Sequence, residues 1–484
     1  MKYIKSFTIL ILVILTLSCS EEFLDRKPIS RISVNAFYED ESDIEIAVTG
    51  LYGTLQDIYN EYIFLTELPA DDGYSPRGGN TGMDLLTYNP MGGLFQTHWR
   101  LAYNSIYSAN KLLEVLPFIE FNSDEKKQLV EGEAYFIRAL NYFNLVRWFG
   151  DVPLVTSVIS TDEAREFLRE DKELVYSQII NDLELAIENL PEKHSGNDVG
   201  RATKGAAQSL LGRVYLTRQN YSEVLSSLDN VIQSNNYSLL ANFNDIFKPD
   251  NANHKESVFE IQYEGGNLGE GSGWSNSAHS RDLSSYFGIG TYDGLVPATD
   301  IINAFDETSL RYEGSLNSVV VKNDTYYHVV KHYMDLDVPN GSDDNWPLIR
   351  YADVILMYVE ASNEINGPTT ETIEMVNKIR RRAYGLAINT PDENVDLLPS
   401  QVASKDVFRE TIWEERRLEL AFEGHRMFDL VRTGRFVEVM TEAFNNAPSS
   451  EYPSKPVPEE YMTLFPIPQG EIDINPDITQ NPGY

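Results

Sequence analysis

Cysteine is almost absent from this sequence of 484 residues, because Cys19 is the only one. A single thiol excludes a disulfide framework within the chain and any metal site built from several thiolates. Positive charge is also scarce: 39 lysines and arginines stand against 74 aspartates and glutamates, a formal net charge of −35. This excess of negative charge argues against nucleic acid and against anionic membrane surfaces as partners.

The apolar run at the start of the chain is short. Phe7–Leu17 has eleven residues and follows Lys2 and Lys5. Eleven residues are too few to span a bilayer but suit the core of a signal peptide. Ser18 before Cys19 resembles a bacterial lipoprotein processing site. We therefore predict a lipoprotein signal peptide at 1–18; an ordinary signal peptide with an unmodified cysteine is the alternative.

Lipidation of Cys19 has two consequences. The mature chain then has no free thiol, and the lipid holds the protein on a membrane rather than through it. Residues 19–40 are interpreted as the anchor and tether. Ser20-Glu21-Glu22 resembles the acidic tag of surface-exposed lipoproteins in Bacteroidetes-type bacteria.

Helical periodicity dominates the remaining chain. Asn122 and Glu125 have the spacing of a capping box, which predicts a helix start there. Gly150 followed by Pro153 predicts its end. Further helices are expected at 101–116, 171–190, 203–218, 221–234, 350–366, 370–384 and 404–422. The pair from Ala206 to Asn236 resembles a tetratricopeptide repeat, in which Gly212 lets its partner helix approach closely.

The stretch 235–345 differs from its surroundings. It is rich in Gly, Asn, Ser and Asp, and short strands are expected at 257–263, 317–321 and 325–331. A hundred residues of loops and short strands inside a helical protein favour a binding region. The glycine-rich 265–273 lacks the ending of a phosphate-binding loop.

The segment Ile412–Arg435, IWEERRLELAFEGHRMFDLVRTGR, combines alternating charge with a glycine break. Glu414 with Arg417, and Arg416 with Glu419, stand three residues apart, which predicts ion pairs on one helix flank. Gly424 is placed to end this helix with a positive φ, and a second short helix is expected from 425 to 434.

This segment resembles the signature of the SusD/RagB family, with ERR, ELAFEGHR and FDLVR in the same order. The family consists of surface lipoproteins that capture nutrients for outer-membrane importers. Family-like motifs span the mature chain: they lie at 19–28, 99–114, 131–155, 202–221, 350–366, 412–435 and 465–484.

The resemblance implies a mainly α fold, in which tetratricopeptide-like helix pairs form an α-α superhelix and an irregular region of loops and short strands packs against them. One SusD-like domain is expected at 41–484, with a helical scaffold at about 41–234 and 346–440. The irregular ligand-side region is then about 235–345, and the C-terminal segment is 447–484.

The implied function is non-catalytic. A lipid-anchored protein of the outer membrane, exposed at the cell surface, binds oligosaccharides or polysaccharides. It delivers them to a TonB-dependent, SusC-like transporter. No cofactor and no metal site are expected, although calcium at an acidic loop such as Asp343-Asp344 stays an open alternative. One histidine and one aspartate, His425 and Asp429, make an incomplete metal site.

Sugar recognition needs aromatic surfaces and hydrogen-bonding groups, so we selected aromatic residues with polar neighbours in loops. Three loops qualify, at 70–80, 265–292 and 343–346. The predicted ligand-binding residues are Asp71, Asp72, Tyr74, Arg77, Trp274, Tyr286, Tyr292 and Trp346. For each aromatic residue, packing of its loop onto the scaffold is the alternative.

Three other functions remain open at this point. An oligopeptide-binding member of the same family is one. A helical glycoside hydrolase with paired carboxylates is the second, although no metalloprotease, nucleophile-elbow or kinase motif is present. A protein–protein adaptor is the third, because soluble tetratricopeptide proteins often have that role.

Overall fold

The computed structural model describes residues 38–76, 81–266, 269–273, 278–288, 290–291, 294–331 and 341–484. The signal peptide, Cys19 and most of the tether lie outside the described residues. The helices of the first half are α2 (Glu41–Tyr59), α3 (Tyr62–Thr66), α4 (Thr81–Asp84), α5 (Gly93–Val115), α6 (Asp124–Phe149), α7 (Thr161–Ala164), α8 (Lys172–Asn189), α9 (Lys204–Thr217) and α10 (Tyr221–Gln233). Those of the second half are α12 (Ser284–Phe287), α13 (Thr299–Ala304), α14 (Leu310–Glu313), α15 (Tyr351–Asn366), α16 (Thr370–Ala383), α17 (Lys405–Leu420), α18 (Arg426–Arg432), α19 (Phe436–Asn446) and α20 (Gln469–Ile474).

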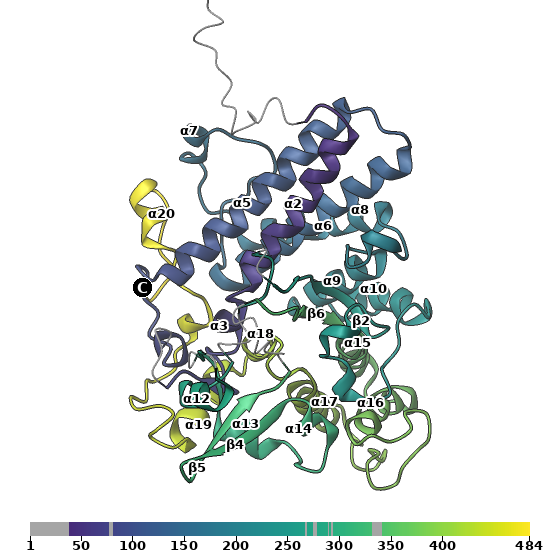
Figure 1. The fold of residues 1–484 in the computed structure, drawn as a ribbon, viewed down its shortest axis with the longest axis vertical. Coiled ribbons are helices and arrows are strands. Elements are labelled where there is room, and N and C mark those ends of the chain that lie inside the picture. The colour runs from purple at the N-terminus through teal and green to yellow at the C-terminus, as the bar shows by residue number, and fades with distance from the viewer. Residues whose placement is uncertain are drawn as a thin grey trace, which may run out of the picture.

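The long helices stack in sequence. Helices α2, α5, α6 and α8 lie side by side in the upper half of Figure 1, and α9, α10 and α15 continue the array. Helices α16 and α17 then pack on α15. This stacking of helix pairs confirms the predicted mainly α fold class of tetratricopeptide-like pairs.

Helix α6 lies at the centre of the array and is buried around most of its circumference from Val130 onward, with Glu133 and Arg138 among its buried side chains. It begins one residue later than predicted. The side chain of Ser123, and not that of Asn122, accepts a hydrogen bond from the backbone N–H of Lys126. The helix ends as expected at Gly150, where φ is +72°.

The contact between α9 and α10 depends on Gly212. A Cβ atom at this position would lie 2.5 Å from Cδ2 of the buried Leu228 on α10. The predicted reason for this glycine, close approach of the partner helix, is therefore confirmed.

Three antiparallel two-stranded ribbons occur in the described part of the chain. They pair β1 (Gly73–Tyr74) with β3 (Val296–Pro297), β2 (Ser257–Ile261) with β6 (Trp346–Arg350), and β4 (Leu316–Val321) with β5 (Asp324–Val329). The β2–β6 ribbon is buried against the helices, and Phe259 makes an edge contact with Phe136 of α6 at 4.9 Å between ring centroids. The irregular region is thus attached to the scaffold through this ribbon.

The C-terminal segment closes one end of the helical array. Phe465 is buried against Phe95 of α5 and Phe149 of α6. Its backbone N–H donates to the carbonyl of Trp148 at 2.7 Å. Helix α20 lies beside α5 in Figure 1, where Gln96 donates to Glu471 at 2.6 Å.

The charged residues of α17 pair differently from the prediction. Arg416 binds Asp353 of α15 at 2.7 Å and Asp429 of α18 at 3.2 Å. Glu419 binds Arg382 of α16 at 2.6 Å. The predicted pairing of Arg416 with Glu419 along one flank is wrong, because this flank is buried and other elements supply the countercharges.

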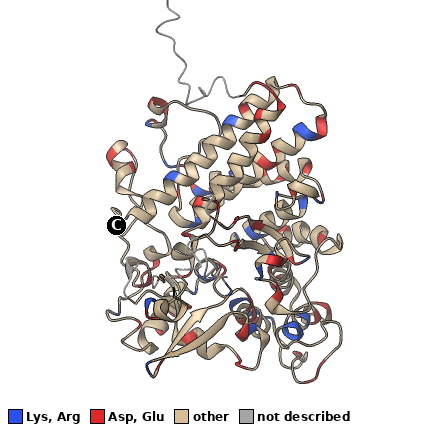
Figure 2. Ribbon diagram, in the orientation of Figure 1, with Lys and Arg blue, Asp and Glu red and all other residues tan. Residues whose placement is uncertain are grey.

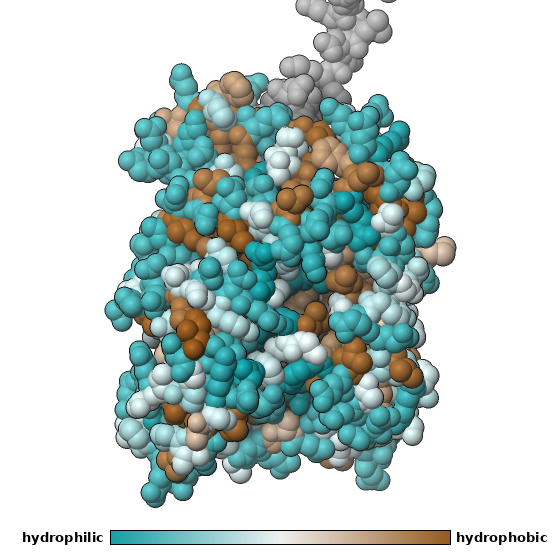
Figure 3. Space-filling model, turned by 180° about the vertical axis from the view of Figure 1, so that it is seen from behind, coloured by the Kyte–Doolittle hydropathy of each residue, from teal (hydrophilic) through white to brown (hydrophobic). Residues whose placement is uncertain are grey.

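Charge and apolar groups are both dispersed over the surface. Figure 2 shows acidic residues on helices and loops throughout the molecule. Figure 3 shows hydrophobic residues in separate groups among hydrophilic ones on the opposite face. Phe118 and Met91 are the most exposed large apolar side chains described, at 83% and 80%. Isolated apolar residues of this kind are normal on a folded protein.

The close approach at Gly212 generates a stability prediction. Gly212→Leu should lower the free energy of unfolding by about 1–3 kcal/mol, because the new side chain overpacks the contact with Leu228. Chemical denaturation measures this change. Gly50→Leu is the matched control, since that glycine is exposed on α2 with open space around its Cβ position. Equal stability of the two variants would contradict the packing argument.

Candidate functional site

The three predicted loops meet in the structure. Strand β1 in the first loop pairs with β3, which directly follows the second loop, in the register Gly73 with Pro297. Ser272 of the second loop forms a β-bridge with Ser342, next to the third loop. The backbone N–H of Tyr263 donates to Oδ1 of Asn345 at 2.8 Å. Segments more than 250 residues apart therefore form one surface, which we call the loop face.

Two predicted aromatic residues lie at this face. Tyr286 is 60% exposed and makes an edge contact with Phe287 at 5.1 Å. Tyr74 is half-buried and packs edge-on against Tyr452 at 6.2 Å. Both are available in part to a ligand, and their contact with one stays a prediction. The predicted residues Arg77, Trp274 and Tyr292 lie outside the described residues.

Trp346 does not belong to the exposed surface. It is 0% exposed, and its ring packs edge-on against Tyr62 at 5.7 Å and in a tilted arrangement against Tyr59 at 6.5 Å. This burial contradicts the prediction of a ligand contact. The physical reason is its place at the start of β6, whose side chains are buried throughout.

Asp71 and Asp72 are also buried, at 2% and 0% exposure. Arg426 donates to both oxygens of Asp71 at 2.7 and 2.8 Å, and Nε of Arg417 donates to Asp72 at 2.8 Å. Burial opposes ionisation, but the two guanidinium groups hold the pKa of Asp71 below its ordinary value. These bonds contradict a direct ligand role for the two aspartates, which instead anchor the base of the first loop.

A cavity of about 860 Å³ lies beside the second and third loops. We call it the amide cavity. Its lining includes Phe247, Gln262, Tyr263, Asp343 and Asn345. The volume is within the range of roughly 300–1,000 Å³ that is usual for ligand sites. Phe247 was not predicted from the sequence, because it lies before the glycine-rich stretch that was taken as the loop. The feature that could have identified it is an aromatic residue close to Asp, Asn and Pro.

The polar wall of the amide cavity is a hydrogen-bonded cluster of side chains. Nδ2 of Asn345 donates to Glu260 at 3.0 Å and to Oε1 of Gln262 at 3.1 Å. Asn253 and Gln262 exchange hydrogen bonds of 2.8 and 3.1 Å. Both N–H hydrogens of Gln262 and of Asn345 are used within this cluster, so the wall is held rigid. Oδ1 of Asn345 accepts one hydrogen bond in the protein and has a lone pair left for a sugar hydroxyl.

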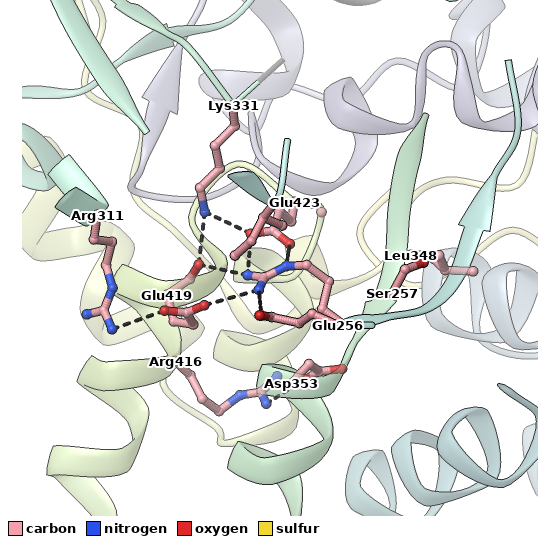
Figure 4. Close-up of polar contacts among 12 residues, drawn as sticks. Glu256, Ser257, Arg311, Lys331, Leu348, Asp353, Arg416, Glu419 and Glu423 are labelled. Carbon is pink, nitrogen blue, oxygen red and sulfur yellow. Dashed lines mark hydrogen bonds and ion pairs between the residues drawn. The ribbon is translucent and has the colours of Figure 1, made fainter. Parts of the chain in front are cut away.

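The half-buried ring of Phe247 rests on buried cations. Nζ of Lys331 lies 5.1 Å from its ring centroid, and the guanidinium of Arg350 lies 5.5 Å from it. Lys331 donates to the carbonyl of Glu419 at 2.9 Å and to Glu423 at 2.8 Å, as Figure 4 shows. Burial lowers the pKa of Lys331 to about 8. The ring of Phe247 in the amide cavity is thus held in place by the buried cations Lys331 and Arg350.

These charges are part of a larger network, which we call the buried ion network. Arg350 binds Glu423 at 2.6 Å and Glu256 at 2.8 Å. Glu419 accepts from Arg382 at 2.6 Å and lies 3.0 Å from Arg311. A buried charge needs countercharges and hydrogen bonds to offset its desolvation, and each carboxylate here has both.

The structure describes no cluster that could hold a metal. Among the described residues, no group of three or more His, Cys, Asp or Glu side chains has suitable geometry. Burial lowers the pKa of His425 to about 3, and Asp429 is bound by Arg416 and Arg432 instead. No helix in the described ranges is long and apolar enough to cross a membrane.

Glu67 joins the base of the first loop to the signature segment. Its Oε1 accepts from the backbone N–H groups of Gly424 at 2.6 Å and His425 at 3.2 Å. Its Oε2 has no hydrogen-bond partner in the described structure. Burial, assisted by the charge of Asp72, raises the pKa of Glu67 to about 8.

This pKa generates a pH prediction. Between about pH 5 and pH 8 the folded protein retains the Glu67 proton that the unfolded chain loses, so its contribution to stability falls as pH rises. Glu67→Gln mimics the protonated acid and should flatten this dependence, by at most about 1.4 kcal/mol per pH unit. Denaturation of both proteins across this range measures the difference. Glu438→Gln on the exposed surface of α19 is the control; identical slopes for wild type and Glu67→Gln would contradict the shift.

Two family models match the chain. The model described as the SusD family matches residues 303–484, and the one described as "Starch-binding associating with outer membrane" matches residues 22–216. A SusD-like protein of Formosa agariphila is 28% identical over 543 residues, covering 99% of this chain and 100% of the relative. A SusD-like protein of Bacteroides ovatus is 26% identical over 495 residues, covering 91% and 85%.

Solved structures of SusD-like proteins are also similar to this chain. A laminarin-binding SusD-like protein has a TM-score of 0.77 at 25% identity, covering 92% of this chain and 100% of that one. A SusD homologue from Bacteroides thetaiotaomicron has a TM-score of 0.80 at 24% identity, covering 94% and 99%. With family models matching both halves and relatives aligned over nearly the whole length, the chain belongs to the SusD/RagB family.

Proposed function

We propose that this protein is a non-catalytic, lipid-anchored binding protein of the outer membrane, exposed at the cell surface. It captures an oligosaccharide or polysaccharide and delivers it to a TonB-dependent, SusC-like transporter. Family membership supports the class of protein, and the name of one structural relative, a laminarin-binding protein, supports a glycan as ligand. The outer membrane is named in the description of one matching family model.

The observation that carries the glycan assignment is the amide cavity. It combines an aromatic ring, Phe247, with a wall of carboxamide groups from Gln262 and Asn345. The C–H face of a pyranose ring packs on aromatic rings, and Oδ1 of Asn345, which accepts one hydrogen bond in the protein, can accept a second from a sugar hydroxyl. A peptide ligand would instead be expected to pair with an exposed strand edge or an apolar groove.

A non-catalytic role fits the polar groups of the amide cavity. The carboxylate of Glu260 beside it accepts hydrogen bonds from Asn345 and from the backbone N–H of Asn253. The side chain of Asp343 accepts from the backbone N–H of Gly265. Carboxylates engaged in this way hold the loops in position, whereas a glycoside hydrolase needs one carboxylic acid and one carboxylate facing the scissile bond.

Glycan capture is tested by removing aromatic surface from the loop face and from the amide cavity. Tyr286→Ala and Phe247→Ala should each weaken glycan binding, by roughly tenfold if about 1.4 kcal/mol of stacking is lost. Isothermal titration of residues 20–484 against neutral and acidic polysaccharides and oligopeptides measures this. Phe118→Ala removes a more exposed aromatic ring far from the loops along the chain and serves as the control. Normal binding by both variants, Tyr286→Ala and Phe247→Ala, would place the ligand elsewhere, and turnover of the ligand would refute the non-catalytic role.

The lipid anchor is tested at Cys19. Cys19→Ala should release the protein from the membrane fraction, because no other residue can take the lipid at this processing site. Fractionation of cells followed by immunoblotting gives the result. Ser18→Ala, which keeps the cysteine and a small preceding residue, is the matched control. Membrane association of the Cys19→Ala protein would contradict lipid anchoring.

A further inference from the structure

A second cavity, of about 330 Å³, lies next to the amide cavity. We call it the basic cavity. It is formed by three segments: 192–203 between α8 and α9, 236–237 after α10, and 253–260, which includes most of β2. The backbone N–H of Ser238 donates to the carbonyl of Lys255 at 2.9 Å, which holds the second and third segments together. None of these residues belongs to the loops that were selected from the sequence.

The two cavities share a wall. Gly200 lines the basic cavity, and a Cβ atom there would lie 2.6 Å from the side chain of Gln262, which lines the amide cavity. Asn253 lines the basic cavity and exchanges hydrogen bonds with the same Gln262. The side chain of Gln262 in the amide cavity therefore lies directly against two residues of the basic cavity, Gly200 and Asn253.

The charge of the basic cavity is opposite to that of the protein. Three cations, Lys193, Arg201 and Lys255, line it, against the two carboxylates Glu192 and Glu260. Lys193 and Lys255 are exposed, and neither makes an ion pair within the described structure. In a chain with a net charge of −35, this is a local reversal of sign.

The two carboxylates of the basic cavity are already engaged. Glu260 accepts from the backbone N–H of Asn253 at 3.1 Å and from Asn345 at 3.0 Å. Glu192 accepts from Asn236 at 3.2 Å and lies 3.6 Å from Nζ of Lys204. Arg201 also has partners within the protein, so the two lysines are the cations left for a ligand.

The basic cavity also has a surface on which a sugar ring can pack. Tyr237 is half-buried and stacks on Tyr351 with ring centroids 6.4 Å apart. Its hydroxyl bonds to Thr203 at 2.9 Å, which fixes the ring. The exposed side chain of Val199 adds apolar surface beside it.

We propose that the basic cavity is a second glycan subsite, which takes an anionic sugar unit of the same chain that occupies the amide cavity. The anionic group is a carboxylate or a sulfate, bound by Lys193 and Lys255. The proposal rests on the proposed function, since it needs a glycan in the amide cavity. It narrows that function to chains that carry negative charge, despite the acidity of the whole protein.

Matched pairs of oligosaccharides test the subsite. Each acidic probe is compared with a neutral chain of the same linkage: oligomannuronate with manno-oligosaccharide, oligogalacturonate with galacto-oligosaccharide, and a sulfated galacto-oligosaccharide with its desulfated form. At low ionic strength, at least one acidic probe should bind ten times more tightly than its neutral counterpart. Tighter binding of a uronate probe would identify the anionic group as a carboxylate, and tighter binding of the sulfated probe would identify it as a sulfate. Added salt should reduce the preference, because the lysines are exposed.

A double variant tests whether the preference for acidic probes arises in the basic cavity. Lys193→Gln with Lys255→Gln should abolish the preference for the acidic probe and leave neutral binding unchanged. The control, Lys172→Gln with Lys322→Gln, makes the same change in net charge at exposed sites outside the cavity and should keep the preference. Retention of the preference in the cavity variant would overturn the subsite.

The subsite and the proposed function fail in different ways. Binding of acidic and neutral chains with equal affinity would overturn the subsite and leave glycan capture intact. Failure of every chain to bind would overturn both. Phe247→Ala distinguishes the role of the amide cavity from that of the basic cavity, because it should lower the affinity for acidic and neutral chains alike.

Discussion

The buried ion network is the interaction on which the rest of this structure depends. Glu419 and Glu423, at the end of α17 and just beyond it, are fully buried and attract cations from strands, loops and a neighbouring helix. A buried carboxylate without its partner is strongly destabilising, by roughly 3–5 kcal/mol in known cases. The network therefore admits essentially one arrangement of the elements that supply the cations.

The position of the candidate site follows from this network. Arg350 ends the buried β2–β6 ribbon, and Lys331 follows the β4–β5 ribbon; both cations lie beneath Phe247. At the base of the first loop, Asp71 and Asp72 are bound by Arg426 and Arg417 of the same signature segment. The base of the first loop is thus tied to α17 and α18 by ion pairs. Charged side chains therefore connect the helical scaffold to the candidate site.

Local patterns were good predictors of local structure. The ends of α8, α9, α15 and α16 lie within a residue of their predicted positions, because capping residues and glycines act over a few residues. The role of Gly212 was predicted from the sequence for the same reason.

The candidate site was predicted only in part. The three loops do converge, but burial of Trp346, Asp71 and Asp72 is a property of the packed molecule, and no pattern of neighbours distinguishes a buried aspartate from an exposed one. Phe247 and the carboxamide wall were missed because their partners lie far apart in the chain.

The sequence by itself determined the class of protein: the helical periodicity, the acidic composition and the family signature are all local properties, readable without coordinates. Only the tertiary structure decided which charges pair and which surface is available. Arg416 and Glu419 stand three residues apart, as ion pairs on a helix do, yet each binds partners on other helices. The physical reason is desolvation: once a helix flank is buried, its charges must be satisfied by whatever elements pack on it. The same packing brings Lys193 and Lys255, more than sixty residues apart in sequence, to one cavity.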